Sequence, residues 1–190
     1  MMAVYEIESA RLILRPLTAA AVDVLHRLWT HPDVRRFLWD DEVIPHEQTA
    51  AIVETSAGMF RDNGYGLWGV SLGDAELIGF AGYWFFRDPP ELELLYGIGA
   101  DHWHRGFATE VARALVRYGF EQLEFTEVRG STDALNVASA CVLEKAGLQF
   151  HRRAATDGLD TVYYRLGRDA FRRDDRPYRL RPFTIPRHPG

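Results

Sequence analysis

The chain has 190 residues, 47% of them hydrophobic and 13% aromatic, which is enough for one sizeable core and short for two full domains. Its formal charge of -5 provides no overall basic field, which argues against a nucleic-acid partner and suits a cationic amine. No run approaches the ~18 to 20 apolar residues of a membrane span, and the N-terminus lacks the basic-then-apolar order of a signal peptide, so we expect a cytoplasmic protein without a membrane partner.

One strand and two helices are predicted in the first sixty residues. Residues 9–17 read as a strand stopped by Pro16, and Thr18 is a suitable N-cap for a helix whose apolar residues recur every three or four positions. After a break at Pro32 we expect a short helical turn, an acidic loop and a second helix over residues 46–60.

An antiparallel hairpin and a central strand follow. Residues 66–72 and 76–86 are apolar runs joined by Gly73-Asp74-Ala75, which is typical of a hairpin turn. Asp88-Pro89-Pro90 then turns the chain into residues 91–99, a partly alternating apolar run that we interpret as the central strand.

Residues 103–110, Trp-His-Arg-Gly-Phe-Ala-Thr-Glu, connect that strand with a long amphipathic helix. The first amides of a helix have no intrahelical partner and lie at the positive end of its dipole, so a turn built from Arg105, Gly106 and Ala108 offers N–H groups to an anion. Spacing alone leaves an ordinary helix start equally open. A Walker-type P-loop is excluded because Lys145, the only lysine, lies in a different predicted helix.

Three strands and one short helix are predicted after the long helix. The strands cover residues 128–132, 148–154 and 161–166, the helix covers residues 136–145, and Asp157-Gly158 marks the last hairpin turn.

The C-terminal residues 169–190 are rich in Arg and Pro, which excludes a helix and indicates an extended tail. The pattern leaves open whether this tail is a mobile terminus, an arm on its own domain or an arm on a second subunit of a homodimer. Cys141 is the only cysteine, so no internal disulfide forms, and we interpret it as a small buried residue in preference to an acyl carrier.

Two ordered motifs resemble the GNAT superfamily of N-acyltransferases. Residues 103–110 resemble its coenzyme A pyrophosphate loop, Gln/Arg-x-x-Gly-x-Gly/Ala, with Trp103 at the Gln or Arg position and Ala108 at the last position. Residues 136–139 and 143–148 are similar to the Asn-x-x-Ser and Glu-Lys-x-Gly-Phe motifs of the RimJ/RimL-type branch, which acetylates ribosomal-protein N-termini.

The resemblance covers residues about 8 to 168, because residues 11–17 also match the family's first strand. It implies an α/β (α+β) GNAT fold: a mixed, mostly antiparallel seven-stranded sheet with helices on both faces and a splay between the fourth and fifth strands. We therefore expect one acetyltransferase domain over residues 1–168 and an extension over residues 169–190.

The resemblance implies that acetyl-coenzyme A (acetyl-CoA) binds in this splay as a co-substrate and that no metal is required. His102 and His104 alternate, but two histidines on a turn are a weak zinc signal. The residues expected to hold acetyl-CoA are Leu95, Tyr96, Trp103, His104, Arg105, Gly106, Phe107, Ala108, Thr109, Asn136 and Ser139.

An amine attacks only after losing its proton, since α-amines titrate near ~8 and Lys-like amines near ~10.4. Glu91 and Glu93 fall on one face of the central strand, and the branch's Glu-Leu-Gly-Tyr segment aligns its Glu with Glu93, which is our candidate base. A cross-strand ion pair or a solvated strand edge is the alternative for both. The resemblance also implies that the first two helices lie over the acceptor, and the residues expected to contact it are Trp39, Asp40, Glu42 and Glu91. A solvated acidic loop with one anchoring Trp is the alternative for residues 39–42.

Attack on a thioester places negative charge on its carbonyl oxygen, and the resemblance implies that a backbone amide near Leu95 or Tyr96 donates to it. The thiol leaves more easily when a hydroxyl donates to it. Many GNAT enzymes use a Tyr for this, but that position is Leu143 here, so Ser139 is the candidate donor, as in the RimJ/RimL-type branch, and Asn136 positions pantetheine or substrate. Without the resemblance, Asn136 reads as the N-cap of the helix over residues 136–145.

The sequence therefore predicts an acetyl-CoA-dependent N-acetyltransferase that transfers the acetyl group directly to a primary amine in a ternary complex, with a protein N-terminal amine as the first candidate acceptor. A small cationic amine, such as an antibiotic, a polyamine or an amino acid, is the alternative acceptor. A non-catalytic acyl-CoA-binding module is the alternative function, because the usual Tyr acid is absent.

Overall fold

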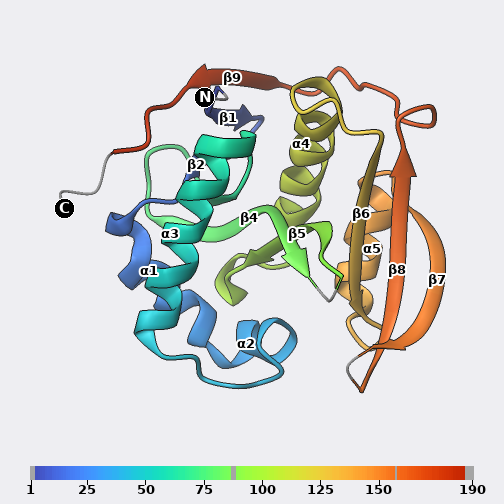
Figure 1. The fold of residues 1–190 in the computed structure, drawn as a ribbon, viewed down its shortest axis with the longest axis horizontal. Helices are drawn as coiled ribbons and strands as arrows, with labels where there is room; N and C mark the ends of the chain where they lie inside the picture. Colours follow the sequence, from blue (N-terminus) through green and yellow to red (C-terminus); the bar gives the residue numbers. More distant parts are fainter. Residues whose placement is uncertain (1–2, 87–88, 157, 187–190) are drawn as a thin grey trace.

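The computed structural model describes residues 3–86, 89–156 and 158–186, and two antiparallel sheets are its main feature. The strands are β1 (Tyr5–Ser9), β2 (Ile13–Pro16), β3 (Leu67–Ser71), β4 (Leu77–Phe86), β5 (Glu91–Ile98), β6 (Glu127–Asp133), β7 (Gln149–Thr156), β8 (Leu159–Gly167) and β9 (Tyr178–Pro182). The helices are α1 (Val22–Thr30), α2 (Pro32–Leu38), α3 (His46–Asn63), α4 (Phe107–Glu121) and α5 (Val137–Lys145). The first sheet has the order β5-β4-β3-β2-β1-β9, and the second has the order β6-β8-β7 (Figure 1).

The mixed α/β fold is confirmed, and so is the splay between the fourth and fifth predicted strands. These strands are β5 and β6, which lie close together but belong to different sheets. Among the described residues the sheets hold nine strands where seven were expected. One extra strand arises because the chain turns after Ser9, whose amide donates to Leu12 O at 2.9 Å, so β1 and β2 form a pair. The tail supplies the other, β9.

The expected helices and hairpins are present, with one local error. Thr18 does not cap the first helix: a short 3-10 helix, Ala19–Ala21, intervenes before α1, and the Thr18 side chain makes no capping hydrogen bond. The hairpin of β3 and β4 is antiparallel as predicted. Asp88 and Asp157, which we placed in turns, lie outside the described residues.

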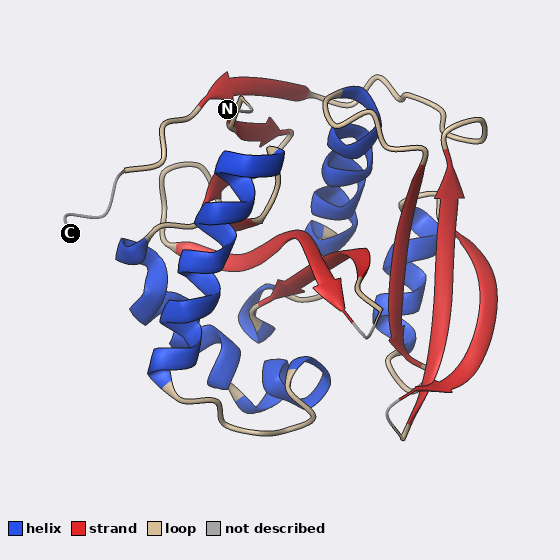
Figure 2. Ribbon diagram, in the orientation of Figure 1, coloured by secondary structure: helices blue, strands red, loops and turns tan. Residues whose placement is uncertain are grey.

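Two apolar clusters cover the first sheet and hold it against its helices. The apolar stripe of α4, including Val111 and Leu115, packs in one cluster with residues of both sheets. Leu25 and Trp29 of α1 pack in the other cluster with Phe80 of β4. Each buried side chain of this kind contributes about 1.5–3 kcal/mol relative to exposure. Figure 2 shows the resulting layers, with α1 and α3 on one side of the first sheet and α5 against the second.

The C-terminal tail adds β9 to the free edge of β1, from Tyr5↔Pro182 to Ser9↔Tyr178. Before this strand the tail crosses α4, where the Phe171 ring lies 4.7 Å from that of Phe120. The Arg117 guanidinium of α4 lies 4.2 Å from the centre of the Tyr178 ring. The tail therefore packs on the chain's own sheet and helix. None of the helices described is both long and apolar enough to cross a membrane.

Candidate functional site

The turn before α4 leaves its first amides open. Gly106 is the N-cap of α4 and has a φ of 78°, in the left-handed region that favours glycine. The Glu110 amide donates to Gly106 O at 3.1 Å, so the amides of residues 107–109 precede the first hydrogen bond of the helix. These N–H groups and the positive end of the helix dipole favour an anion at this turn.

A clamp between Arg11 and Glu110 holds the turn in place. Glu110 Oε1 accepts from the Arg11 amide and from Ser9 Oγ, each at 2.8 Å, and Glu110 Oε2 accepts from Arg11 Nε at 2.7 Å. Arg11 Nη1 donates to Arg105 O at 3.0 Å, and its guanidinium lies 4.6 Å from the centre of the Phe107 ring. The β1–β2 turn therefore braces the loop that carries Gly106. Our sequence reasoning assigned Arg11 no role, although it opens the matched first strand.

A groove of about 530 Å³ extends from Gly106 and Thr109 along the outer face of α4 to the C-terminal tail. Its cationic lining side chains are Arg11, Arg113, Arg117, Lys145 and Arg176, and its acidic ones are Glu110 and Asp174.

This cationic excess is local, because the whole chain carries a formal charge of -5. Arg113 Nε donates to Lys145 O at 2.8 Å, and across the described part of the chain neither side chain forms an ion pair. A groove of this size and charge, continuous with open helix amides, fits a ligand with several phosphates. Sequence reasoning assigned no binding role to Arg113 or Lys145, although Lys145 stands in the motif of residues 143–148.

Tyr96, Ser139 and Asn136 join β5 to α5 across the splay. The Ser139 amide donates to Asn136 Oδ1 at 3.1 Å, so Asn136 is the N-cap of α5 as the sequence suggested. The Tyr96 hydroxyl donates to Ser139 O at 2.9 Å and lies 3.0 Å from Ser139 Oγ. Burial raises the pKa of Tyr96 far above its ordinary value, so this phenol stays protonated at neutral pH.

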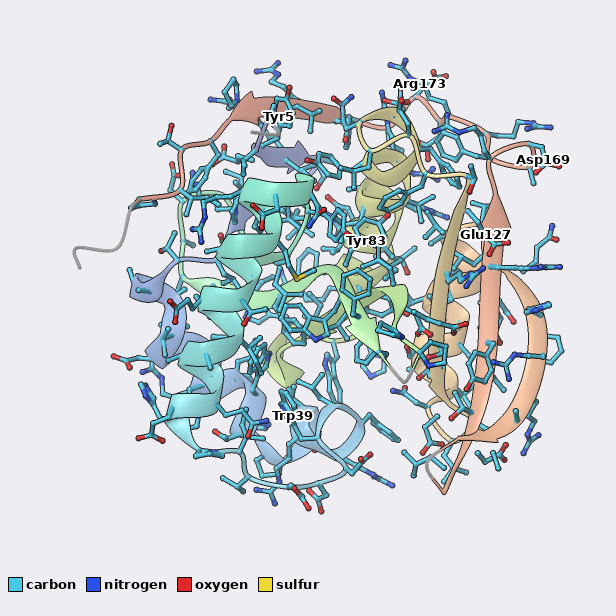
Figure 3. All side chains as sticks on the ribbon, in the orientation of Figure 1. Tyr5, Trp39, Tyr83, Glu127, Asp169 and Arg173 are labelled. Carbon is cyan, nitrogen blue, oxygen red and sulfur yellow. The ribbon has the colours of Figure 1, made fainter. Side chains whose placement is uncertain are left out.

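A charged cavity of about 140 Å³ lies where β5 meets the second sheet. Glu93, only 3% exposed, lines it, and Ser131 Oγ donates to Glu93 Oε2 at 2.6 Å. Arg129 lies 3.5 Å from Glu91 and donates to Glu127 at 2.6 Å, and this hydrogen bond is the main cause of its raised pKa. Figure 3 shows Glu127 on β6, beside the second sheet's central strand.

The cavity and the Tyr96–Ser139 contact lie on opposite sides of β5. Successive side chains of a strand point to opposite faces, so Glu91 and Glu93 share one face and Tyr96 points to the other. Two substrates can therefore approach the gap between β5 and β6 from opposite sides. That arrangement suits group transfer between a ligand at the α4 and α5 side and a ligand in the charged cavity.

The residues predicted to contact the acceptor substrate lie in two separate places. Glu91 lines the cavity with Glu93, whereas Trp39, Asp40 and Glu42 do not. The Trp39 ring lies 5.5 Å from that of Trp29, in the apolar cluster that also includes Leu95. Figure 3 shows Trp39 beside α2, well away from Glu127.

The side chains of residues 103–110, the loop that resembles the pyrophosphate loop, differ in their surroundings. Trp103, 42% exposed, donates its Nε1 to Ile98 O at 2.6 Å, so it braces the end of β5. His104 has a φ of 58°, Phe107 is buried, and the Arg105 guanidinium lies 4.8 Å from the centre of the Phe107 ring. Within the described ranges, His, Cys, Asp and Glu side chains nowhere gather in threes that could hold a metal ion.

Comparisons with known proteins place these features in one family. The family model described as the acetyltransferase (GNAT) domain matches residues 11–149. The uncharacterized N-acetyltransferase YoaA of Bacillus subtilis (strain 168) is 30% identical over 145 residues, which cover 75% of this chain and 82% of YoaA. FsC-acetyl coenzyme A-N(2)-transacetylase of Aspergillus fumigatus is 28% identical over 206 residues, covering 95% of this chain and 83% of that protein. The structure of RimL, a ribosomal L7/L12 alpha-N-protein acetyltransferase in complex with coenzyme A, has a TM-score of 0.72 at 18% identity, covering 86% of this chain and 97% of RimL, which is a likeness of fold.

Proposed function

The chain belongs to the GNAT acetyltransferase family, and from that premise we propose that it transfers an acetyl group from acetyl-CoA to a primary amine by direct attack while both substrates are bound. GNAT acetyltransferases use acetyl-CoA, which supplies an acetyl group activated as a thioester. The observation that carries the proposal is the gap between β5 and β6, with a buried carboxylate on one face and a Tyr96–Ser139 pair on the other. A cytoplasmic location is part of this proposal.

The coenzyme site is proposed at the α4 and α5 side of the gap. Pantetheine would lie between β5 and β6 near Tyr96, Asn136 and Ser139, and the pyrophosphate at the open amides of residues 107–109. The cationic groove beside Gly106 supports this placement, because the nucleotide end of coenzyme A carries several negative charges. Trp103 and Phe107 would act by shaping the loop, since both side chains are engaged with the protein itself.

Substitutions of two cations in the groove test its role in acetyl-CoA binding. Arg113→Gln and Lys145→Gln are each expected to raise the KM for acetyl-CoA about three- to tenfold and to leave kcat within about twofold, because charge-assisted phosphate contacts at exposed cations are moderate in strength. Added salt should shrink the difference from the parent protein. Steady-state release of free thiol at varied acetyl-CoA concentrations measures kcat and the KM for acetyl-CoA. The control is Arg153→Gln, because the Arg153 side chain pairs with Asp160 on the second sheet. An unchanged KM for acetyl-CoA in both Arg113→Gln and Lys145→Gln contradicts the proposed coenzyme site.

The amine is proposed to enter the charged cavity, where Glu93 accepts its proton directly or through water. A backbone amide near Leu95 or Tyr96 would donate to the carbonyl oxygen of the acetyl group. Because β5 is the edge strand of the first sheet, its backbone amides that point toward β6 make no hydrogen bonds within that sheet. Such an amide can donate to the carbonyl oxygen. Ser139 would donate to the departing thiol, and Tyr96, whose hydroxyl donates to Ser139 O, would hold the start of α5 beside β5.

Removing the Ser139 hydroxyl tests the donor role. Ser139→Ala is expected to lower kcat about ten- to a hundredfold with little change in either KM, because the hydroxyl assists only the departure of the thiol. The α5 cap should survive, since the Ser139 backbone amide makes the bond to Asn136. Thiol-release kinetics measure the effect, and Ser139→Thr, which keeps a hydroxyl, is the matched control. An unchanged kcat in Ser139→Ala would remove Ser139 from the mechanism.

The first acceptor that we propose is a protein N-terminal amine, supported by the RimJ/RimL-type motifs around Asn136 and Lys145. A small amine is the second candidate, and the likeness to the Aspergillus N(2)-transacetylase, which spans 95% of this chain, supports transfer to a nitrogen acceptor. A free-thiol release assay with acetyl-CoA against a panel of N-terminal peptides and small amines distinguishes them. Turnover on one class names the acceptor, and coenzyme binding without any turnover would favour a non-catalytic module.

A further inference from the structure

Among the described arginines that line the charged cavity beside Glu93, one has no carboxylate partner. Arg129 is paired with Glu91 and Glu127, and Arg165 lies 3.7 Å from Glu127. Arg152 also lines the cavity, yet none of the carboxylates in the described residues lies within ion-pair distance of it. Its guanidinium lies 3.6 Å from the centre of the Tyr163 ring. A planar cation held against an aromatic face keeps its N–H groups available at the ring's edges.

The strand register places this cation across from the proposed base. Ser131 on β6 pairs with Tyr163 on β8, and Tyr163 pairs with Arg152 on β7, so these residues form one row across the second sheet. Ser131 holds Glu93 at one end of the row. Because the Arg152 guanidinium reaches back over Tyr163, it lies about one to two strand spacings, ~5–10 Å, from the Glu93 carboxylate.

We propose that the acceptor carries an anionic group, a carboxylate in the simplest case, within a few bonds of its reactive amine, and that Arg152 binds this group while Glu93 faces the amine. The inference rests on the proposed function and narrows its acceptor class. A cavity of about 140 Å³ has the volume of roughly five waters, which suits the amino-carboxylate head of a small molecule.

The other cations of the cavity favour the same class of acceptor. A polyamine or aminoglycoside would bring several positive charges next to Arg129, Arg152 and Arg165 and would be repelled there. An amine with a nearby carboxylate instead presents one charge of each sign. The chemistry has two sources, a free amino acid or a peptide N-terminus with an acidic side chain at its start, and the same contacts serve both.

The test compares Arg152→Gln with Arg153→Gln. Arg153 is the next residue of β7, its side chain pairs with Asp160, and it does not line the cavity, so it is a matched control. The acceptors are two pairs that differ only in the anionic group: alanine with alaninamide, and the peptide amides Asp-Ala-Ala-Ala and Asn-Ala-Ala-Ala. The decisive quantity is each variant's kcat/KM relative to the parent protein on the same acceptor, because differences in amine basicity then cancel.

Arg152→Gln is expected to lower kcat/KM about tenfold on the carboxylate-bearing acceptors, through KM, and to stay within about twofold of the parent on their carboxamide partners. The acceptor pair on which Arg152→Gln shows this loss identifies whether the carboxylate belongs to a free amino acid or to a peptide. Arg153→Gln should match the parent on all four acceptors. An equal loss on both members of a pair, no loss, or turnover by the parent on the carboxamides alone overturns the inference and leaves the proposed acetyltransferase function intact.

Binding measurements separate this inference from the acetyltransferase proposal. If the parent protein acetylates none of the four acceptors, each is titrated calorimetrically into the protein saturated with coenzyme A. The carboxylate site is supported, while the proposed reaction fails, if alanine or the Asp peptide binds to the parent protein, its carboxamide partner does not bind, and Arg152→Gln abolishes the binding. Absence of any carboxylate-dependent binding overturns the site.

Discussion

Glu93→Gln is expected to lower kcat/KM at neutral pH by about 10²- to 10⁴-fold, the contribution of a positioned general base. Glu93 is nearly fully buried and accepts from Ser131 Oγ at 2.6 Å. Glutamine keeps the shape and a carbonyl oxygen for that hydrogen bond, so the substitution removes the base with little change in packing. Steady-state thiol release with a saturating acetyl donor and varied acceptor measures the loss.

The pH dependence of Glu93→Gln distinguishes a base from a structural role. An α-amine titrates near ~8, so an increasing fraction of the acceptor is already deprotonated as the pH rises above neutrality. The deficit of the variant should therefore shrink between about pH 7 and pH 9. Glu91→Gln is the matched control on the same face of β5; it removes a partner of Arg129, which retains Glu127, so a loss of less than about tenfold is expected. A deficit that is constant with pH would assign Glu93 a structural role.

Local sequence patterns were sufficient for the parts of the site that lie within one element. The alternation of β5 placed Glu91 and Glu93 on one face, and the cap pattern placed Asn136 at the start of α5. Gly106 marked the turn before α4 because few other residues adopt its positive φ. In each case the geometry depends on neighbours in the sequence, which a pattern can record.

The contacts that assemble the site join distant segments, and no local pattern contains them. Arg11 and Glu110 are 99 positions apart, and the pairing of β9 with β1 closes almost the whole length of the chain. The tail composition excluded a helix but could not select a partner strand. The acidic loop at Asp40 and Glu42 was assigned to the acceptor by resemblance, whereas the cavity beside Glu93 is lined by residues of the second sheet.

The second large effect is expected for Glu110→Ala, which removes the acceptor that joins the β1–β2 turn to α4. The carboxylate accepts from Ser9 Oγ, the Arg11 amide and the Arg11 guanidinium, and its side chain is 13% exposed. We expect the free energy of unfolding to fall by about 2 to 3 kcal/mol, the cost of leaving charged and backbone donors without their partner in a partly solvated site. The melting temperature should fall by about 5–10 °C for a chain of this size.

The same substitution should weaken coenzyme binding, and this links the clamp to function. Without Glu110 the Arg11 side chain is no longer held against Arg105 O, so the loop at Gly106 loses its brace and acetyl-CoA should bind about tenfold more weakly by calorimetry. Arg11→Gln should keep most of the stability, because the backbone amide and Ser9 still donate to Glu110, but should share the loss of affinity. Glu121→Ala, at the other end of α4, removes a partly buried pair with Arg117 and a longer one with the exposed Arg173, and should cost about 1 kcal/mol with unchanged affinity. If Glu110→Ala lost stability yet bound acetyl-CoA as tightly as the parent, the clamp would serve the fold alone.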